Sequence, residues 1–327
     1  MLTRRFGRLG WQLGEIGYGM WGVGRGEGGW TGASDPECMA SLEQAVALGC
    51  NFFDTAWIYG RGHSEALLGR LLRSSSGTRL YAATKIPPRD RRWPSTRDSR
   101  LADVFPPEHI SEYVAKSRAN LQTDRIDLLQ FHVWEDSWAE DPSWQRQIER
   151  LKSAGVIEAV GISLNRWEPW NALRTLRTGL IDVVQVIYNL FDQAPEDELF
   201  GLCRELDVAV VARVPFDEGT LTGTLTKETT WPPGDWRSSY FVPENLSESV
   251  ERAEALKRVL PPGWSLPELA LRFILQNPDV HCVIPGMRRV AHARSNIACS
   301  DGQPLPAVLM QELRRHRWDR LPTEWSQ

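Results

Sequence analysis

Eight short apolar segments alternate along this chain with stretches of helical periodicity. We expect these segments to be strands, and they lie near residues 15–19, 50–54, 79–84, 126–131, 156–162, 181–186, 208–213 and 280–284. Strands that alternate with helices are typical of a parallel sheet covered by helices. Eight such units suit a closed barrel, so the chain is predicted to be an α/β protein with a (β/α)8 TIM-barrel fold.

Sequence signals mark the ends of several predicted helices. The helix expected over about 36–48 follows Ser34, which suits an N-cap, and stops at Gly49. The helices expected near 108–121 and 265–276 each begin beside a proline, which is tolerated in a first turn. These boundaries support the predicted alternation.

Composition argues against several other classes of protein. The length of 327 residues would allow two domains, but α/β barrels often reach this size as one, so a single domain over 1–327 is expected. The net charge is −4 and there is no basic stripe, which argues against a nucleic-acid partner. No apolar run approaches about 18 residues and no targeting segment is evident, so we expect a soluble cytoplasmic protein with no membrane partner.

The five cysteines are scattered and never spaced as a CxxC pair. This spacing supports neither a metal site nor a disulfide framework. Buried free thiols are the expectation.

Four polar side chains stand at or just beyond the ends of three consecutive predicted strands. Asp54 ends the second strand and Tyr59 follows five residues later, while Lys85 and His132 end the next two. In a parallel barrel the carboxyl ends of all strands face one mouth, so these groups are expected to converge there. Singly, each has an ordinary structural explanation; together they predict one site.

The chemistry that suits this set is delivery of a proton to a carbonyl oxygen. A tyrosine is a weak acid at neutral pH, and a nearby ammonium lowers its pKa by favouring the phenolate. Lys85 is expected to act in this way on Tyr59, with Asp54 holding the ammonium in place. His132 is expected to hydrogen-bond the substrate oxygen.

The chain resembles the aldo-keto reductase superfamily. The matching segments occur in the family's order over nearly the whole chain: 49–60, 63–65 with 68–69, 84–85, 124–132, 161–163, 184–189 and 283–286. The resemblance implies a barrel reductase that uses NADPH, with Asp54, Tyr59, Lys85 and His132 as its catalytic tetrad.

A second motif, Gly17-Tyr18-Gly19-Met20-Trp21-Gly22, satisfies G-x-G-x-x-G. A dinucleotide-binding fingerprint requires a strand, a tight turn and a helix in immediate succession. Here a glycine-rich loop follows, and the next helical pattern begins only around Asp35. We therefore interpret the motif as the first barrel strand and its loop.

A better cofactor site lies late in the chain, where Arg288 and Arg289 follow the eighth strand at the start of a helix. Helix N-termini and guanidinium groups both favour phosphate. In the resembling family this stretch binds the 2′-phosphate of NADPH, so NADPH or NADP is the expected cofactor, with NADH as an alternative. The cofactor contacts that the resemblance implies are Met20, Ser163, Asn165, Gln185, Arg213, Pro215, Gly219, Gly286, Arg288, Arg289, His292 and Asn296.

Two details of this set depart from the family. Leu164 stands where many members have asparagine, and Asn165 is expected to replace it. Arg213 stands where an aromatic ring often stacks on the nicotinamide; a guanidinium can also stack on a planar ring.

Two long segments leave the predicted catalytic face, at 86–106 and 217–245. They are rich in proline and charge, no helix is predicted in the first, and both are interpreted as lids over substrate or cofactor. The chain has fifteen tryptophans, and four of them are expected to line the substrate pocket: Trp21, Trp57, Trp93 and Trp134. Indole faces suit both sugar rings and aromatic carbonyls.

The predicted function is therefore an NADPH-dependent oxidoreductase that reduces an aldehyde or ketone, its small-molecule partner, to an alcohol. One alternative is a sugar or alcohol dehydrogenase that runs the same chemistry in the oxidising direction. The other is a nicotinamide-binding regulatory subunit with slow turnover, against which the intact tetrad argues.

Overall fold

The computed structural model describes residues 1–24, 32, 34–75 and 77–323. Its central element is an eight-stranded parallel sheet in which sequence neighbours are also spatial neighbours, from β3 to β10. The strands are β3 (Tyr18–Gly19), β4 (Phe52–Asp54), β5 (Tyr81–Ile86), β6 (Ile126–Phe131), β7 (Ile157–Ser163), β8 (Val183–Ile187), β9 (Ala209–Arg213) and β10 (Cys282–Val283). All eight predicted strands are confirmed, and the predicted α/β barrel class holds.

The first and last strands meet and close the sheet into a barrel. Parallel bridges join Ile16 to Val283 and Gly19 to Gly286, and the backbone N–H of Gly17 donates to the carbonyl of Val283 over 2.8 Å. A side chain at position 19 would place its Cβ 2.6 Å from the carbonyl oxygen of Ile284. Glycine is therefore required where these two segments approach each other.

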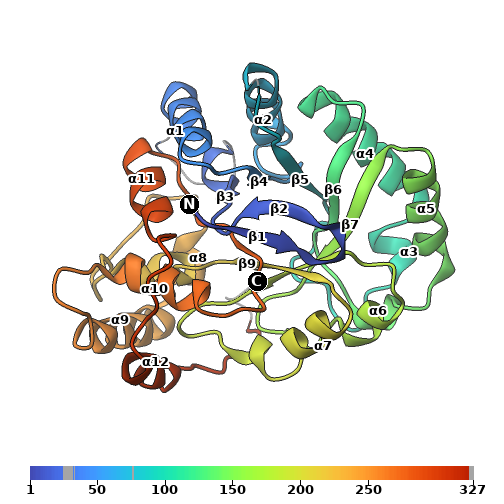
Figure 1. Cartoon of the computed structure of the whole chain (residues 1–327). Helices are drawn as coiled ribbons and strands as arrows, with labels where there is room; N and C mark the ends of the chain where they lie inside the picture. The colour runs from blue at the N-terminus through green and yellow to red at the C-terminus, as the bar shows by residue number, and fades with distance from the viewer. Residues whose placement is uncertain (25–31, 33, 76, 324–327) are drawn as a thin grey trace.

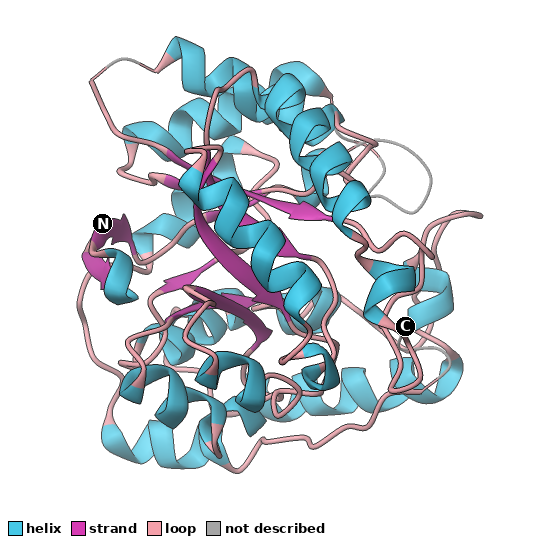
Figure 2. Ribbon diagram, turned by 90° about the vertical axis from the view of Figure 1, so that its right-hand side faces the viewer, coloured by secondary structure: helices cyan, strands magenta, loops and turns pink. Residues whose placement is uncertain are grey.

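Helices surround the barrel on its outside, as Figures 1 and 2 show. They are α1 (Asp35–Ala47), α2 (His63–Ser74), α3 (Leu101–Val104), α4 (Pro107–Leu121), α5 (Pro142–Ser153), α6 (Leu173–Arg177), α7 (Leu199–Glu205), α8 (Arg237–Tyr240), α9 (Pro243–Lys257), α10 (Leu266–Leu275), α11 (Val290–Ala298) and α12 (Ala307–Arg314). The Ser34 side chain accepts from the N–H of Glu37 to complete a capping box, and Ser265 caps α10 in a similar way. The three predicted helix starts are confirmed within one residue.

An N-terminal hairpin that we did not predict covers one end of the barrel (Figure 1). Its strands β1 (Thr3–Phe6) and β2 (Trp11–Gly14) pair antiparallel around a turn. Phe6, Trp11 and Leu13 pack against strand residues inside the barrel. The sequence signals for this hairpin are the alternation Trp11-Gln12-Leu13 and the glycines at 7 and 10 between the strands, and they span only a few residues.

The two long loops contain more structure than predicted. The first includes the four-residue helix α3, because Leu101 and Val104 are buried and lie one turn apart. The second contains the 3-10 turn η5 (Asp217–Thr222), helix α8 and the start of α9. Tyr240 and Phe241 of this loop form a small hydrophobic cluster with Leu246 and Val250 of α9.

The remaining sequence expectations concern membranes, thiols and the glycine motif. Within the described ranges, no helix combines the length and apolarity needed to span a membrane; a cytoplasmic location stays a prediction. All five cysteines are buried free thiols, as predicted. After β3 the chain forms the 3-10 turn η2 (Trp21–Val23), and α1 begins only at Asp35, so the interpretation of the glycine motif is confirmed.

Candidate active site

The four residues predicted to form one site lie together at the carboxyl end of the barrel. Nζ of Lys85 donates to Oδ2 of Asp54 over 2.6 Å and to the carbonyl of Thr55 over 2.8 Å. The same ammonium lies 5.2 Å from the centre of the Tyr59 ring, and that ring meets the His132 imidazole edge-on at 5.8 Å. Three neighbouring strands thus deliver a carboxylate, an ammonium, a phenol and an imidazole to one place.

Two glutamines hold the second oxygen of Asp54, and sequence reasoning assigned this role to neither. Nε2 of Gln130 and Nε2 of Gln185 both donate to Oδ1 of Asp54, over 3.0 and 2.8 Å. Gln185 lies in the middle of β8, and its side chain reaches Asp54 of β4 across the barrel. The carboxylate is therefore fully engaged, and its orientation toward Lys85 is fixed.

Helix α2 supports the strand ends from behind. Oγ of Ser64 accepts from the Thr55 hydroxyl over 2.8 Å, and Oε1 of Glu65 accepts from the Thr84 hydroxyl over 2.6 Å. Thr55 follows Asp54 and Thr84 precedes Lys85 in the sequence, so these bonds tie both neighbours of the ion pair to one helix. The matching segment at 63–65 thus has a structural role beside the site.

Burial and charge move the pKa values of the tyrosine and the histidine. Burial raises the pKa of Tyr59 above its ordinary value, and the Lys85 ammonium acts in the opposite direction. Lys85 is thus expected to favour the phenolate, but in this structure burial outweighs it. Burial, with the charges of Lys85 and Arg213, holds the pKa of His132 well below its ordinary value, so the imidazole is neutral at physiological pH.

Close packing around Tyr59 leaves room only for glycine at position 24. A Cβ there would lie 2.8 Å from the backbone carbon of Tyr59. The backbone N–H of Tyr59 also donates to the carbonyl of Ala56 over 3.0 Å. The Tyr59 side chain therefore projects from a tightly packed, hydrogen-bonded turn.

Of the predicted cofactor contacts, Ser163 and Met20 are buried, and Asn165 is hydrogen-bonded to other protein groups. Ser163 ends β7 and is 2% exposed. Met20 is buried, and its carbonyl accepts from the Ser64 hydroxyl. Asn165 instead donates through Nδ2 to Oε1 of Glu135 over 2.8 Å and to the carbonyl of Trp134 over 3.1 Å. Its amide nitrogen is therefore part of a buried polar cluster with Glu135 and the backbone of Trp134.

The end of β9 and the segment after it contain three more predicted cofactor contacts, at Arg213, Pro215 and Gly219. Arg213 ends β9 and donates to the carbonyl of Leu164 over 2.9 Å. Burial lowers the pKa of Arg213 to about 10, and the charge of Arg166 adds to this effect. Pro215 is buried, while Gly219 is half-buried with φ of +116°.

The remaining predicted cofactor contacts surround the start of α11, and among them Arg288 and Arg289 are the predicted phosphate contacts. Arg288 is half-buried, Arg289 is the exposed N-cap residue, and His292 lies exposed in the first turn. Gly286 is exposed before the helix, and Asn296 is buried within it.

Two acidic residues distant in sequence lie close enough to the arginine pair to interact with it. Hydrogen bonds from Ser34 lower the pKa of Glu37, and the charges of Arg289 and Arg288 contribute. The charge of Asp235 acts on Arg288, whose pKa burial lowers. The sequence around the arginines contains no such carboxylate.

The four predicted pocket tryptophans have different surroundings. Trp21 packs against Trp236 of the second long loop at 4.8 Å, and Trp93 of the first loop meets the His132 ring at 5.7 Å. Trp57 packs edge-on against Tyr113 at 4.8 Å. Trp134 is fully buried in the core, where its indole N–H donates to the Thr175 hydroxyl over 2.8 Å. Its placement argues against a role in lining a pocket, because no part of the ring is exposed.

A polar, anionic cofactor fits the groups around the mouth. Nδ1 of His132, Nε of Arg213 and Oγ1 of Thr220 are buried and have no hydrogen-bond partner among the described residues. Buried polar groups normally have a partner, so these atoms suit a bound ligand. Arg288 and Arg289 at a helix start supply the positive charge that a nucleotide phosphate requires.

Comparisons with known proteins agree with this geometry. Residues 15–317 match the Aldo/keto reductase family. The chain is 29% identical to an NADH-specific methylglyoxal reductase of Escherichia coli (strain K12), over 92% of this chain and 94% of that protein. It is 30% identical to a D-threo-aldose 1-dehydrogenase of Pseudomonas sp, over 92% and 93% of the two chains. The solved structure of the glycerol dehydrogenase AKR11B4 from Gluconobacter oxydans superposes with a TM-score of 0.77 at 25% identity, covering 96% of this chain and 94% of that one. This chain therefore belongs to the aldo/keto reductase family of NAD(P)H-dependent oxidoreductases.

Proposed function

We propose that this protein reduces an aldehyde or ketone to the corresponding alcohol, with NADPH as the preferred cofactor. The observation that carries this proposal is the Lys85 ammonium, which is held by Asp54 and the Thr55 carbonyl and lies 5.2 Å from the Tyr59 ring. A buried, fixed cation beside a phenol is suited to stabilise the negative charge that develops when the phenol gives up its proton.

Each residue of the site has a separate role in the proposed reaction. When bound, a nicotinamide cofactor would supply the hydride that reduces the carbonyl carbon. Tyr59 donates its proton to the carbonyl oxygen, and Lys85 stabilises the resulting phenolate. The neutral His132 imidazole donates a hydrogen bond to the same oxygen and so sets its position relative to Tyr59. Asp54, held by Gln130 and Gln185, keeps the ammonium in place.

The proposed preference for NADPH is based on Arg288 and Arg289. Guanidinium groups match phosphate oxygens in geometry and charge, and α11 begins directly after them. Glu37 and Asp235 oppose this preference, because carboxylates repel a 2′-phosphate. A relative at 29% identity is named NADH-specific, so the affinities for NADPH and NADH are to be compared directly.

An aromatic or sugar carbonyl suits the proposed substrate pocket. Trp21 and Trp93 come from different loops. The centre of the Trp21 ring lies 6.4 Å from that of Tyr59, and the centre of the Trp93 ring lies 5.7 Å from that of His132. Both are half-buried, so part of each ring is open to a ligand. We propose that the loops 86–106 and 217–245 act as lids over this pocket, because the second loop also contacts Trp21 through Trp236.

Oxidation of a sugar or alcohol is the second candidate, because it uses the same residues in reverse. It is favoured by the names of two relatives, a D-threo-aldose 1-dehydrogenase and a glycerol dehydrogenase. In that direction Tyr59 accepts the proton of the alcohol, and its raised pKa disfavours the phenolate at neutral pH. Oxidation is therefore expected to accelerate as the pH rises, whereas reduction uses the neutral phenol.

A steady-state assay in both directions tests the function. The panel contains aromatic aldehydes, short dicarbonyls and aldoses with each reduced cofactor, and the matching alcohols and sugars with each oxidised cofactor. We expect the highest kcat/KM for reduction with NADPH. The Tyr59→Phe variant provides the background rate. Cofactor binding without turnover of any substrate in the panel would instead support a regulatory subunit.

A further inference from the structure

The segment that follows β9 adopts an unusual backbone conformation. Val214, Asp217 and Glu218 have positive φ values of 55°, 45° and 56°, and Gly219 follows with 116°. Residues other than glycine rarely adopt this region, because their Cβ is crowded there. A turn of this kind persists only where its surroundings hold it in place. We call residues 214–219 the strained turn.

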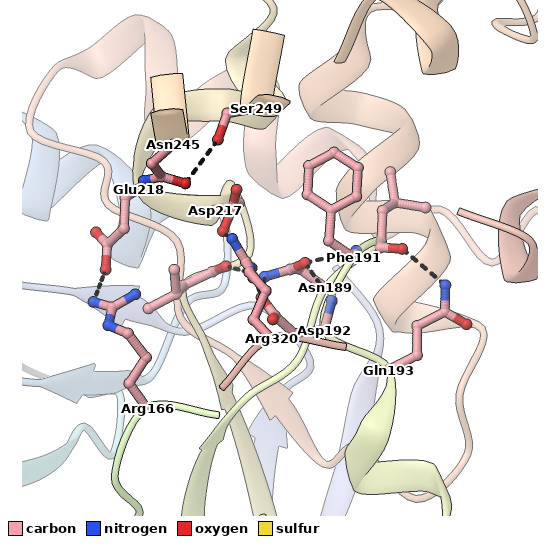
Figure 3. A network of polar contacts seen from close by, with 12 residues as sticks. Arg166, Asn189, Phe191, Asp192, Gln193, Asp217, Glu218, Asn245, Ser249 and Arg320 are labelled. Atoms are coloured by element: carbon pink, nitrogen blue, oxygen red, sulfur yellow. Dashed lines mark hydrogen bonds and ion pairs between the residues drawn. The ribbon is translucent and has the colours of Figure 1, made fainter. Parts of the chain in front are cut away.

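Two ion pairs hold the strained turn, and their arginines come from distant parts of the chain (Figure 3). Arg166, in the loop after β7, pairs with Glu218 over 2.5 Å. Arg320, which lies beyond the last helix α12, pairs with Asp217 over 2.8 Å. Both carboxylates are buried, at 7% and 0% exposed. The C-terminal segment therefore reaches the carboxyl end of the barrel and fixes one side of the turn.

Arg320 is itself held firmly. Its guanidinium carbon lies 4.5 Å from the centre of the Trp167 ring and 4.4 Å from that of Trp318. Nη2 also donates to Asp192 over 2.6 Å, and the same Asp192 oxygen accepts from Asn189 over 2.8 Å. A planar cation between two aromatic faces and two carboxylates has little freedom, so it acts as a rigid anchor.

The same network of hydrogen bonds and ion pairs contacts residues that we propose bind the cofactor. Nδ2 of Asn189 donates to the carbonyl of Val214 over 3.0 Å, one residue beyond Arg213. Pro215 and Gly219, two of the proposed contacts, belong to the strained turn, and the unpaired hydroxyl of Thr220 follows directly. A shift of Asp217 would therefore move the backbone on which these contacts depend.

We propose that Arg320 is a positioning residue for the cofactor site, which holds the strained turn through Asp217 and Asp192 in the shape that presents Pro215, Gly219 and Thr220 to the nicotinamide cofactor. The inference rests on the proposed function, because it requires that the cofactor binds beside this turn. It makes the C-terminal segment a determinant of cofactor affinity, although Arg320 itself contacts no reacting atom.

The test compares Arg320→Met and Arg320→Lys with Arg317→Met. Arg317 lies in the same segment and also pairs with carboxylates, but its partners Asp197 and Asp319 lie outside the strained turn. NADPH and NADH binding are measured by isothermal titration calorimetry, because Trp167 and Trp318 beside Arg320 would complicate fluorescence. Unfolding midpoints are recorded for every variant.

We expect Arg320→Met to weaken binding of the preferred cofactor by about tenfold or more, since a preorganised site becomes a mobile one. Arg320→Lys should recover part of the loss and Arg317→Met should bind within about twofold of the unmodified protein. The cofactor KM of Arg320→Met should rise, while kcat at saturating cofactor changes little.

If Arg320→Met does not fold, Asp217→Asn provides the same test from the other partner and should weaken cofactor binding to a similar degree. An unchanged cofactor affinity in a folded Arg320→Met or Asp217→Asn variant would overturn the inference and leave the proposed function intact. Failure of the unmodified protein to bind either cofactor would instead overturn the proposed function, and this inference with it.

Discussion

Nζ of Lys85 lies 2.6 Å from Oδ2 of Asp54, and the two side chains are 0% and 3% exposed. A buried ion pair is costly to form unless hydrogen bonds satisfy its remaining donors and acceptors. Here Gln130 and Gln185 satisfy the carboxylate, and the Thr55 carbonyl accepts from the ammonium. The pair is therefore a rigid charged unit beside Tyr59, which suits a catalytic role better than a purely stabilising one.

Replacement of Tyr59 by phenylalanine removes the proposed acid and keeps the ring. We expect kcat for carbonyl reduction to fall by roughly 10²- to 10⁴-fold, the typical contribution of one positioned acid, with cofactor affinity nearly unchanged. Steady-state kinetics and calorimetry measure the two effects. Tyr81→Phe is the matched control, because Tyr81 begins β5 and stacks on Trp11 of the hairpin, away from the site. Retention of most activity in Tyr59→Phe would refute the mechanism.

Replacement of Lys85 by methionine removes the main group that lowers the pKa of Tyr59. Burial still raises the pKa of the phenol, and the largest opposing effect is gone, so this pKa rises further. We expect most activity to be lost, and residual alcohol oxidation to require a more basic pH, because that direction needs the phenolate. The pH profile of oxidation provides the measurement. An unshifted profile in an active Lys85→Met protein would leave Lys85 with a structural role only.

The neutral state of His132 predicts the shape of the pH profile for reduction. Because burial, Lys85 and Arg213 hold the pKa of His132 well below its ordinary value, the imidazole should not titrate in its ordinary range around pH 6.5. We expect kcat/KM to show no inflection in that range that depends on this residue. His132→Gln keeps a neutral hydrogen-bond donor and should give a profile of the same shape with a lower rate. An inflection near pH 6.5 that disappears in His132→Gln would contradict this assignment.

The assignment of Arg288 and Arg289 predicts tighter binding of NADPH than of NADH. Charge-assisted contacts to a 2′-phosphate contribute about 1.5 to 3 kcal/mol each, so even one of them yields a preference of roughly tenfold or more. Replacing both arginines by alanine should abolish the difference, mainly by weakening NADPH. Arg294→Ala on the same helix is the control, since Arg294 donates to Gln44. Titration of both cofactors by quenching of tryptophan fluorescence is the measurement, and equal affinities in the unmodified protein would refute the assignment.

The Arg272–Asp301 pair predicts part of the acid sensitivity of the fold. Hydrogen bonds from Arg272 lower the pKa of Asp301 to about 2. A carboxyl group whose pKa is lower in the folded state stabilises the fold above its ordinary pKa and loses that contribution as the pH falls. The free energy of unfolding should therefore fall between about pH 4 and 2 by more in the unmodified protein than in Asp301→Asn. Urea unfolding at several pH values checks this, and parallel curves for the two proteins would contradict it.

The sequence alone was enough to predict the barrel and the composition of its mouth. Alternating apolar and amphipathic segments specify parallel strands with covering helices, because burial of apolar faces depends on local periodicity. Strand ends then carry Asp54, Lys85 and His132 to one edge by topology alone, and their proximity in the structure agrees with that expectation. The short hairpin β1–β2 was missed, because strands of four residues carry too weak a pattern.

Only the tertiary structure decided how the side chains are engaged. Gln130 and Gln185 meet at Asp54, Asn165 turns toward Glu135, and Trp134 lies in the core. It also decided that burial outweighs Lys85 in setting the pKa of Tyr59, and that Arg320 reaches Asp217 from the far end of the chain. Hydrogen bonds, desolvation and ion pairing depend on distances between residues remote in sequence, and local periodicity does not specify those distances.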